Sequence, residues 1–285
     1  MSVISIVLML LGICLIAFFL YGSKGLLFQL AKHTSVLIGL SQTDMKLKYA
    51  GAYLGILWAF AQPILTTFIY WFVFEVGFRS APVENFPFIL WLITGLVPWF
   101  FFSDVIVSGT SCMGEYSYLV KKVMFNIDVL PMVKIISGLF VHIVFMAFVI
   151  ALYLVYRISF TFHMVQILYY SFCLLILCVG IVYVTATFNV FIKDTIQVVS
   201  VIMQVIFWMT PIVWDVNIMP KPIQTVLKFN PLYYIVTGYR DAFINKVWFW
   251  EKRQETIFFW LLCSFVLFIG TNLFYKFKPH FADVL

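Results

Sequence analysis

The feature that most constrains this 285-residue chain is a series of seven apolar runs, most of them long enough to cross a lipid bilayer. A spanning helix needs about 20 mostly apolar residues. Only 11% of the residues are charged and 64% are hydrophobic, which leaves too little polar surface for a soluble globule. The runs cover approximately residues 3–22, 52–78, 88–112, 133–156, 164–190, 196–214 and 256–275. We therefore predict an all-α integral membrane protein with six core transmembrane helices.

The first run, 3–22, is predicted as an extra N-terminal apolar helix within residues 1–23. It has no basic residue before its apolar core and no small-residue cleavage pattern after it, so it is a poor signal peptide. Residues 24–285 form one transmembrane domain. Within it, 24–48 mixes apolar and charged residues, which predicts an amphipathic helix at the membrane interface. The long 215–255 loop has apolar stretches of its own and predicts short re-entrant helices at the outer face.

The distribution of basic residues predicts the orientation, because Lys and Arg are retained in short cytoplasmic loops. If successive loops alternate between the two sides of the membrane, ten lysines lie inside, whereas the short outer loops hold only Arg79 and Arg157. The inside lysines are Lys24, Lys32, Lys46, Lys48, Lys121, Lys122, Lys134, Lys193, Lys276 and Lys278. Six further basic residues in 215–255 are partly balanced by four acids. We predict a multi-pass protein of the cytoplasmic membrane with a cytoplasmic C-terminus.

Several function classes find no support in the sequence. The net charge of +6 comes from short basic clusters between apolar runs, which predicts no nucleic-acid partner. No G-x-x-x-x-G-K-[ST] motif is present, so any ATP-driven work would need a partner chain. The five cysteines lack a paired metal-binding spacing and are interpreted as packing residues. We predict no cofactor, no metal and no catalytic residue.

Polar residues recur at helical spacing along two of the predicted spans. One series is Gly51, Gly55, Trp58, Gln62 and Thr66, and the other is Gln197, Ser200, Gln204, Trp208 and Pro211. Amide and hydroxyl groups can bond sugar hydroxyls, and an indole face can contact sugar C–H groups. We predict that Trp58, Gln62, Thr66, Gln204 and Trp208 line a substrate channel. The alternative is that these groups bond between packed helices and line nothing.

Gly51 and Gly55, four apart, would allow another helix to approach closely or leave clearance for a polymer.

Single polar residues inside spans leave other function classes open. Glu75 and Asp104 have no evident intramembrane partner of opposite charge, whereas an ion-coupled transporter more often carries paired ionisable groups. A membrane enzyme acting on lipid-linked sugars could use Asp104, Glu75 or His142, although no spacing places two of them together.

The inside loop 113–132 mixes aromatic and aliphatic residues with two lysines, and this mixed stretch ends before Pro131. This pattern predicts a short amphipathic helix at the membrane surface. Such a helix could dock into a groove of a cytoplasmic partner or could simply anchor the loop at the interface. The residues predicted to couple an ATPase to the channel are Tyr116, Tyr118, Lys121, Lys122 and Phe125.

Several segments together resemble the membrane subunit of ATP-binding-cassette polysaccharide exporters of the ABC-2 type. The matching stretches are LKYAGAYLGILWAFAQP (47–63), PFILWLITGLVPWFFFSD (87–104), YLVKKVMFNIDVLP (118–131), NVFIKDT (189–195), NPLYYIVTGYRDAF (230–243) and KPHFADVL (278–285). The family includes permeases for O-antigen, capsular polysaccharide and wall teichoic acid. The stretches 70–79 and 83–95 are most similar to the teichoic-acid branch.

This resemblance implies a homodimeric channel with two separate ATPase subunits, an N-terminal interface helix and a coupling helix in the first inside loop. It also implies that the first and fifth core spans wall the channel, which are the spans that carry the two polar series. The expected function is ATP-driven export of a lipid-linked polysaccharide or teichoic acid across the cytoplasmic membrane. The segment 3–22 departs from the basic family pattern.

Overall fold

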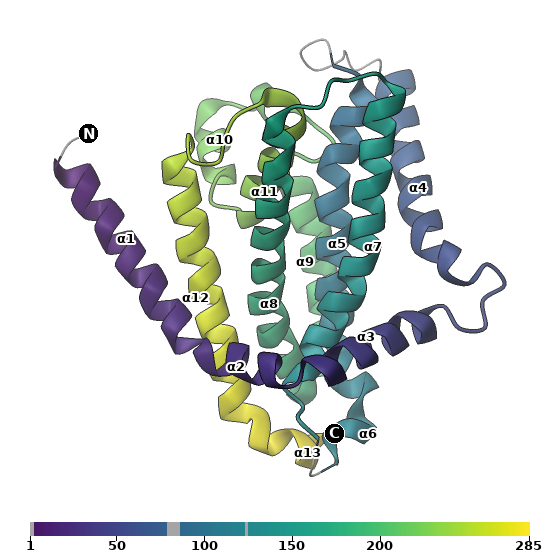
Figure 1. The fold of residues 1–285 in the computed structure, drawn as a ribbon, viewed down its shortest axis with the longest axis vertical. Coiled ribbons are helices and arrows are strands. Elements are labelled where there is room, and N and C mark those ends of the chain that lie inside the picture. The colour runs from purple at the N-terminus through teal and green to yellow at the C-terminus, as the bar shows by residue number, and fades with distance from the viewer. Residues whose placement is uncertain (1–2, 79–85, 123–124) are drawn as a thin grey trace.

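The computed structural model describes residues 3–78, 86–122 and 125–285, with side chains described for these ranges except residues 3–11 and 27. The predicted outer-loop residue Arg79 and residues 123–124 of the coupling segment lie outside the described residues. Within the described ranges all regular elements are helical and no strand occurs (Figure 1). The prediction of an all-α protein is therefore confirmed.

Five helical stretches of the described chain are long and apolar enough to cross a membrane. They are built on α4 (Trp58–Trp71), α5 (Phe88–Glu115), α7 (Val129–Val155), α8 (Ile167–Phe191) and α12 (Arg253–Phe277). A sixth apolar helix, α9 (Thr195–Met209), has 15 residues and would extend about 22 Å, short of a hydrocarbon core of about 30 Å. It ends just before Pro211, which has no N–H for the helical ladder.

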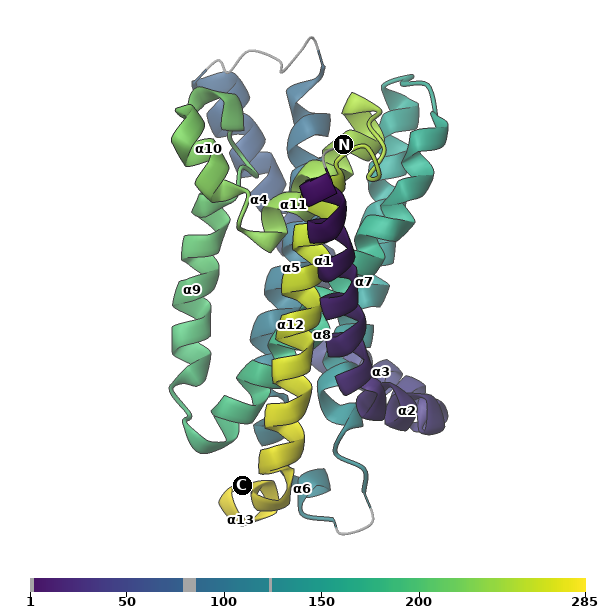
Figure 2. The same cartoon turned by 90° about the vertical axis from the view of Figure 1, so that its left-hand side faces the viewer.

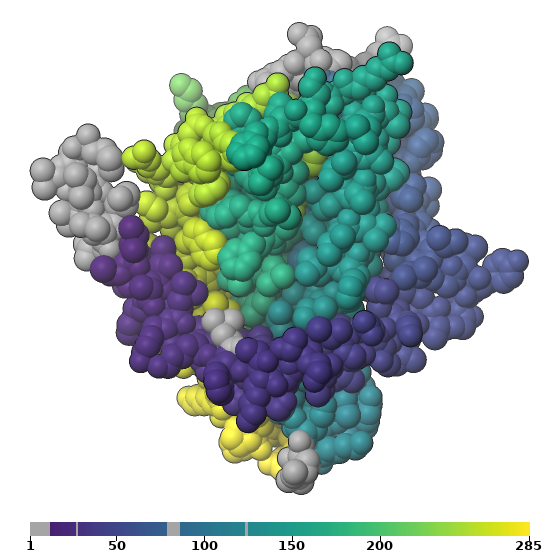
Figure 3. Space-filling view, viewed as in Figure 1, coloured from purple at the N-terminus to yellow at the C-terminus, as the bar shows by residue number. Residues whose placement is uncertain are grey.

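The N-terminal helices lie on the outside of this bundle. α1 (Val3–Gly22) packs against α12 and meets α2 (Lys24–Lys32) at a bend of 45° (Figure 2). α2 and α3 (Thr34–Lys48) then cross the lower end of the bundle. The space-filling view shows them as a dark belt across this face (Figure 3). α3 packs against α7.

The bundle is organised around α5. This helix packs against α4, α7, α8, α9 and α11, and it supplies many of the buried side chains. The stretch that contains α4 is, by contrast, largely exposed, because α4 contacts mainly α5. The structure therefore combines a packed core with one loosely attached helix at its edge.

A close approach of α8 and α12 completes the core. A Cβ atom added to Gly270 would lie 2.5 Å from the carbonyl oxygen of Gly180, and one added to Gly180 would lie 2.9 Å from the backbone nitrogen of Leu267. No side chain fits at either position. Small residues of this kind allow membrane helices to pack at backbone distance.

Short helices close the two ends of the bundle. At the upper end in Figure 1 lie α10 (Lys221–Leu227) and α11 (Pro231–Arg240), and a π-helical turn, Asp241–Asn245, follows α11. The Asn230 side chain caps α11 by accepting from the backbone N–H of Leu232 at 3.0 Å. At the lower end lie α6 (Ser117–Val120) and α13 (Phe281–Val284).

Gly51 lies ahead of the apolar stretch Gly55–Gly77 and Gly55 is the first residue of that stretch, so the two glycines do not form the helix-packing pair that their spacing suggested. Gly51 and Gly55 have φ angles of +79° and +51°, a region that disfavours side chains. The first lies in a turn and the second begins a single 3₁₀ turn, Gly55–Leu57, ahead of α4. No atom of the described chain would lie within 4 Å of a Cβ added to either glycine. These glycines turn the chain from α3 into α4.

Candidate channel wall and coupling region

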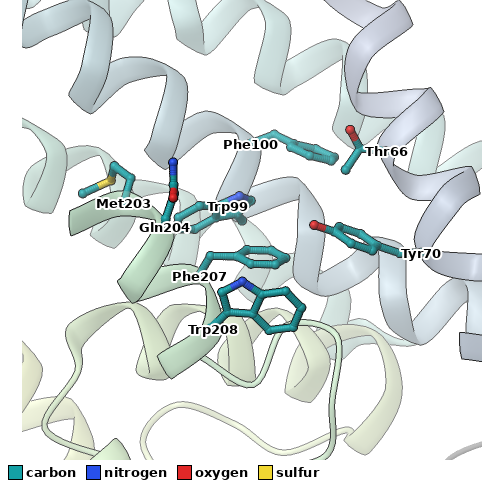
Figure 4. A pocket seen from close by; sticks show the side chains of 8 residues that line it. All are labelled: Thr66, Tyr70, Trp99, Phe100, Met203, Gln204, Phe207 and Trp208. Atoms are coloured by element: carbon teal, nitrogen blue, oxygen red, sulfur yellow. The ribbon is translucent and has the colours of Figure 1, made fainter. Parts of the chain in front are cut away.

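A cavity of about 360 Å³ lies between α4, α5 and α9 (Figure 4). Each of the three helices contributes side chains to it, and most of these are aromatic or amphipathic. The lining residues are Thr66, Tyr70, Trp99, Phe100, Met203, Gln204, Phe207 and Trp208. Side chains of the consecutive helices α4 and α5 and of the distant α9 thus face one space.

Aromatic contacts fix much of the cavity lining. The ring of Phe207 stacks on Tyr70 with centroids 5.6 Å apart, and it packs against Trp99 and Trp208 at 5.1 and 5.3 Å. Ring pairs at these distances attract beyond simple area burial. Phe207 is therefore the central ring that joins the α4, α5 and α9 sides of the cavity.

The polar groups of the cavity are available to a ligand. The hydroxyls of Thr66 and Tyr70 and the amide of Gln204 have no hydrogen-bond partner within the described part of the chain. A hydroxyl can both donate and accept, and an amide offers both functions on separate atoms. Together with the exposed indole of Trp208, they form an aromatic and hydrogen-bonding surface suited to a sugar chain.

Three of the five predicted channel residues meet in this cavity: Thr66, Gln204 and Trp208. The other two, Trp58 and Gln62, are exposed on α4 and lie outside it. Tyr70 was not predicted, although it continues the α4 series by one helical turn. Trp99 and Phe207 carried no polar pattern in the sequence, and only packing brings them here.

The predicted coupling segment is held by a buried ionic cluster below this cavity. Asp44 on α3 accepts hydrogen bonds from Tyr116 Oη and Lys134 Nζ, both at 2.6 Å, and from Ser137 Oγ at 2.7 Å. Lys134 Nζ also lies 2.7 Å from Glu115 Oε2. Three segments of the chain, α3, the turn before α6 and α7, therefore meet at the Asp44 carboxylate, and Lys134 links the end of α5 to them.

The charge state of this cluster follows from its bonds. Burial would raise the pKa of Asp44, but the hydrogen bonds from Lys134, Tyr116 and Ser137 outweigh it and hold the pKa below its ordinary value. Burial and the bond to this carboxylate raise the pKa of Tyr116 well above its ordinary value. Asp44 is thus ionised and Tyr116 is protonated at neutral pH.

The residues predicted to contact an ATPase separate into two groups. Tyr118, Lys121 and Lys122 are exposed at the lower end of the molecule. Tyr116 is buried against Asp44, and Phe125 is half-buried against the core. The structure therefore leaves three of the five side chains exposed, and it places the other two where they hold the segment.

The far end of this segment is tied to the C-terminus and to α2. Lys278 forms an ion pair with the buried carboxylate of Asp128. The Tyr183 hydroxyl donates to the backbone carbonyl of Asp128 at 2.6 Å, and Asn126 donates to the Gln29 side chain at 3.2 Å. The exposed part of the coupling segment, with Tyr118, Lys121 and Lys122, is therefore held on one side by Tyr116 and on the other by Asp128.

Asp104 on α5 pairs with Lys48 at the end of α3, with Nζ 2.7 and 2.9 Å from the two carboxylate oxygens. The sequence predicted no intramembrane partner for Asp104, and the partner found here comes from α3, outside the spanning helices. The two residues are 56 positions apart in the sequence, so no local pattern indicates the pair. Both side chains are more than a third exposed.

The three residues considered for enzymatic chemistry are engaged separately. Asp104 is ion-paired, Glu75 is exposed beyond the end of α4, and His142 Nε2 lies 3.0 Å from the hydroxyl of Tyr239 in the core. No group of His, Cys, Asp or Glu residues in the described chain is arranged to hold a metal ion. These three residues therefore do not form an acid–base pair at one site.

Comparison with known proteins places this architecture in a family. The family model described as ABC-2 type transporter matches residues 36–244, from α3 into the π-helical turn after α11. The chain belongs to the ABC-2 type transporter family. Its matched region includes the cavity between α4, α5 and α9 and the ionic cluster around Asp44.

Relatives of this ABC-2 type chain carry names that refer to O-antigen export. Two proteins of Klebsiella pneumoniae, each named O-antigen export system permease protein RfbA, are 28% and 27% identical to it over 258 and 259 residues, covering 88% of this chain and 95% of each relative. A protein of the same name from Myxococcus xanthus is 28% identical over 217 residues, covering 75% of this chain and 82% of the relative. The chain is thus a transporter permease related to polysaccharide exporters, and not an enzyme by family.

Proposed function

We propose that this chain forms half of a homodimeric channel through which two separate ATPase subunits drive a lipid-linked polysaccharide from the cytoplasmic to the outer face of the cytoplasmic membrane. The observation that carries the proposal is the cavity between α4, α5 and α9. It combines aromatic faces with polar groups that no described residue satisfies. The membership in the ABC-2 family and the names of the relatives agree with it.

The homodimer is supported by the exposure of α4 and α9. Both helices carry large apolar side chains on their outer faces, among them Leu65, Phe68, Val201 and Val205, each more than half exposed. In a membrane protein, exposed apolar residues can face either lipid or another subunit, so their exposure alone does not distinguish a lipid-facing surface from a subunit interface. A polar-lined cavity between the same helices favours a second subunit, because a wet path must be closed off from lipid.

The ATPase partner would bind at the end that carries α6. There Tyr118, Lys121 and Lys122 project from a fixed base. This end also holds the C-terminus and the belt of α2 and α3, and we assign it to the cytoplasm in accordance with the lysine count. The opposite end, with α10 and α11, then lies outside.

The polymer is proposed as an O-antigen-like polysaccharide, in agreement with the names of the relatives. Wall teichoic acid remains the alternative, supported by the similarity of residues 70–79 and 83–95 to that branch. The two can be separated chemically, since only teichoic acid is rich in phosphodiesters. Phosphate analysis of the surface polymer made by a strain with and without this chain distinguishes them.

The test of the function is purification of the tagged chain from its own host in a mild detergent. We expect a P-loop ATPase in equal amount and a mass that fits two copies of each subunit. We also expect a strain lacking the chain to lose surface polymer labelled by periodate oxidation and hydrazide. Recovery of the chain without any ATPase, together with unchanged surface polymer, contradicts the proposal.

A further inference from the structure

A second cavity, of about 210 Å³, lies at the end of the bundle opposite α6. Its lining comes from the N-terminal part of α5, the segment that follows α9, and α11 with the turn after it. The residues used below are Trp91, Asp215, Asn217, Tyr233, Arg240 and Lys252. None of them belongs to the predicted channel residues.

The cavity is built on a fixed guanidinium group. Arg240 is 7% exposed and lies over the ring of Trp91, with Cζ 3.5 Å from the ring centroid. Its two terminal nitrogens donate to the backbone carbonyls of Pro211 and Ile212, each at 2.6 Å. Arg240 therefore fixes the segment after α9, and that segment carries Asp215 and Asn217. Its Nε N–H is buried and has no acceptor in the described chain.

Other polar groups of this cavity are also without a protein partner. One carboxylate oxygen of Asp215 accepts from the backbone N–H of Asn217 at 2.9 Å, and no described residue bonds the other oxygen. The hydroxyl of the buried Tyr233 and the side-chain amide of Asn217 have no hydrogen bond in the described chain. Buried polar groups normally find partners, and Arg240 Nε is such a group without one. Asp215 is half-buried and Asn217 is exposed beside it, so their free polar atoms are accessible to a ligand or water.

The balance of charge and hydrogen-bond types selects the ligand class. The cavity holds two basic and two acidic residues, and Lys252 is already paired with Asp241. An anion would meet the Asp215 carboxylate, which can only accept hydrogen bonds. A sugar hydroxyl can donate to Asp215 and accept from Arg240 or Asn217. The aromatic ring of Tyr233 supplies an apolar surface for a sugar face.

This cavity also lies in line with the first one. Trp91 precedes Trp99 by eight residues on α5, so the two side chains are about 12 Å apart along the helix axis. On the other side, Trp208 of the first cavity is followed by Pro211 and Asp215 of the second. The indole N–H of Trp214 donates to the carbonyl of Trp208 at 3.2 Å and joins the two regions.

We infer that this cavity is a binding site for one uncharged sugar unit, placed beyond the first cavity on the side where the polymer would leave. The inference rests on the proposed export of polysaccharide. Arg240 acts as the positioning residue, because it holds the backbone that presents Asp215 and Asn217. Tyr233 and Asp215 contact the sugar.

The test uses the complete exporter, with its ATPase, in lipid nanodiscs. Saturation-transfer difference NMR is recorded with the methyl glycosides of glucose, galactose, mannose, rhamnose and N-acetylglucosamine. We expect transfer to at least one of them. The Tyr233→Phe/Asp215→Asn double variant keeps the shapes of both side chains and should bind that sugar about tenfold more weakly, since it loses a donor and an ionised acceptor. Lys221→Ala, on exposed α10 outside the cavity, is the matched control and should bind as the wild type does.

Several results would overturn the inference. These are transfer to none of the five glycosides, equal transfer in the double variant, or loss of transfer only in Gln204→Ala, which changes the first cavity. Displacement of the sugar by inorganic phosphate would assign an anion site instead. A different result contradicts the proposed function, namely recovery of the chain without any ATPase together with unchanged surface polymer. An active exporter whose sugar transfer is insensitive to the double variant contradicts this inference alone.

Discussion

The ionic cluster around Asp44 and the cavity between α4, α5 and α9 are both built from polar side chains at membrane helices, yet they differ in one respect. In the cluster, Asp44 accepts three hydrogen bonds and Lys134 contacts two carboxylates. In the cavity, the polar groups of Thr66, Tyr70 and Gln204 have no described partner. Satisfied polar groups hold segments together, whereas unsatisfied groups beside aromatic rings are available to a ligand.

This difference predicts that substitutions in the cluster change stability, and that substitutions in the cavity change transport. A variant that behaved in the opposite way would break the comparison. The variants below are ordered by the size of the expected effect.

The largest effect is expected for Asp44→Ala. The substitution leaves the buried Lys134 ammonium with Glu115 as its one carboxylate, and Glu115 is about half exposed. Removing one partner of a buried pair costs about 3 kcal/mol. We expect a clearly lower thermal unfolding midpoint of the purified chain, measured by tryptophan fluorescence. An unchanged midpoint would show that the cluster does not hold α3 on the bundle.

Trp208→Ala should reduce export about fivefold, since it removes one aromatic face from the cavity. The unfolding midpoint and the amount of bound ATPase should stay close to wild type, because Trp208 is more than half exposed. Surface polymer is measured by periodate labelling. Trp58→Ala is the matched control on α4, also exposed but outside the cavity. An equal loss of surface polymer in both variants would extend the sugar path to the exposed face of α4. No loss in either variant would contradict the assignment of this cavity to the channel.

The double charge reversal Lys121→Glu/Lys122→Glu should reduce the ATPase recovered with the tagged chain about threefold, because exposed charges at an interface contribute modestly to affinity. The unfolding midpoint should not change. Lys221→Glu/Lys228→Glu, at the opposite end of the bundle, gives the same change of net charge and should leave recovery of the ATPase as it is. Equal recovery in both double variants would place the partner elsewhere.

The smallest effect is expected for Asp104→Ala. Its ion pair with Lys48 is short, but both side chains are more than a third exposed. Pairs of this kind contribute about 0.5 kcal/mol. The unfolding midpoint should therefore fall much less than in Asp44→Ala. A fall as large as that of Asp44→Ala would show that the exposed pair also holds α3.

Much of the fold could be predicted because its causes are local. The apolar runs and the amphipathic character of 24–48 are readable one segment at a time. The predicted span near 196–214 was too long, because α9 ends at Met209 ahead of Pro211. The positions of Gly51 and Gly55 were assigned to a helix because helical spacing alone does not report a positive φ.

The site was predictable only in part. Thr66, Gln204 and Trp208 were identified because polar residues recur at helical spacing in apolar runs. Trp99, Phe207 and Tyr233 look like ordinary apolar or interfacial residues, and nothing in their own segments marks them. The partners of Asp44 and Asp104 come from segments more than fifty residues away, so no local pattern predicts them.

The sequence by itself determined that this chain crosses a membrane, is helical and carries polar residues on two of its spans. In hydrocarbon the backbone N–H and C=O groups of a spanning segment must bond to each other, and an apolar run does this by forming a helix, without help from the rest of the chain. Only the tertiary structure decided which polar groups pair and which remain available. A side chain's partners depend on how helices pack, and here that packing satisfies Asp44 while leaving Gln204, Tyr70 and Tyr233 facing open cavities.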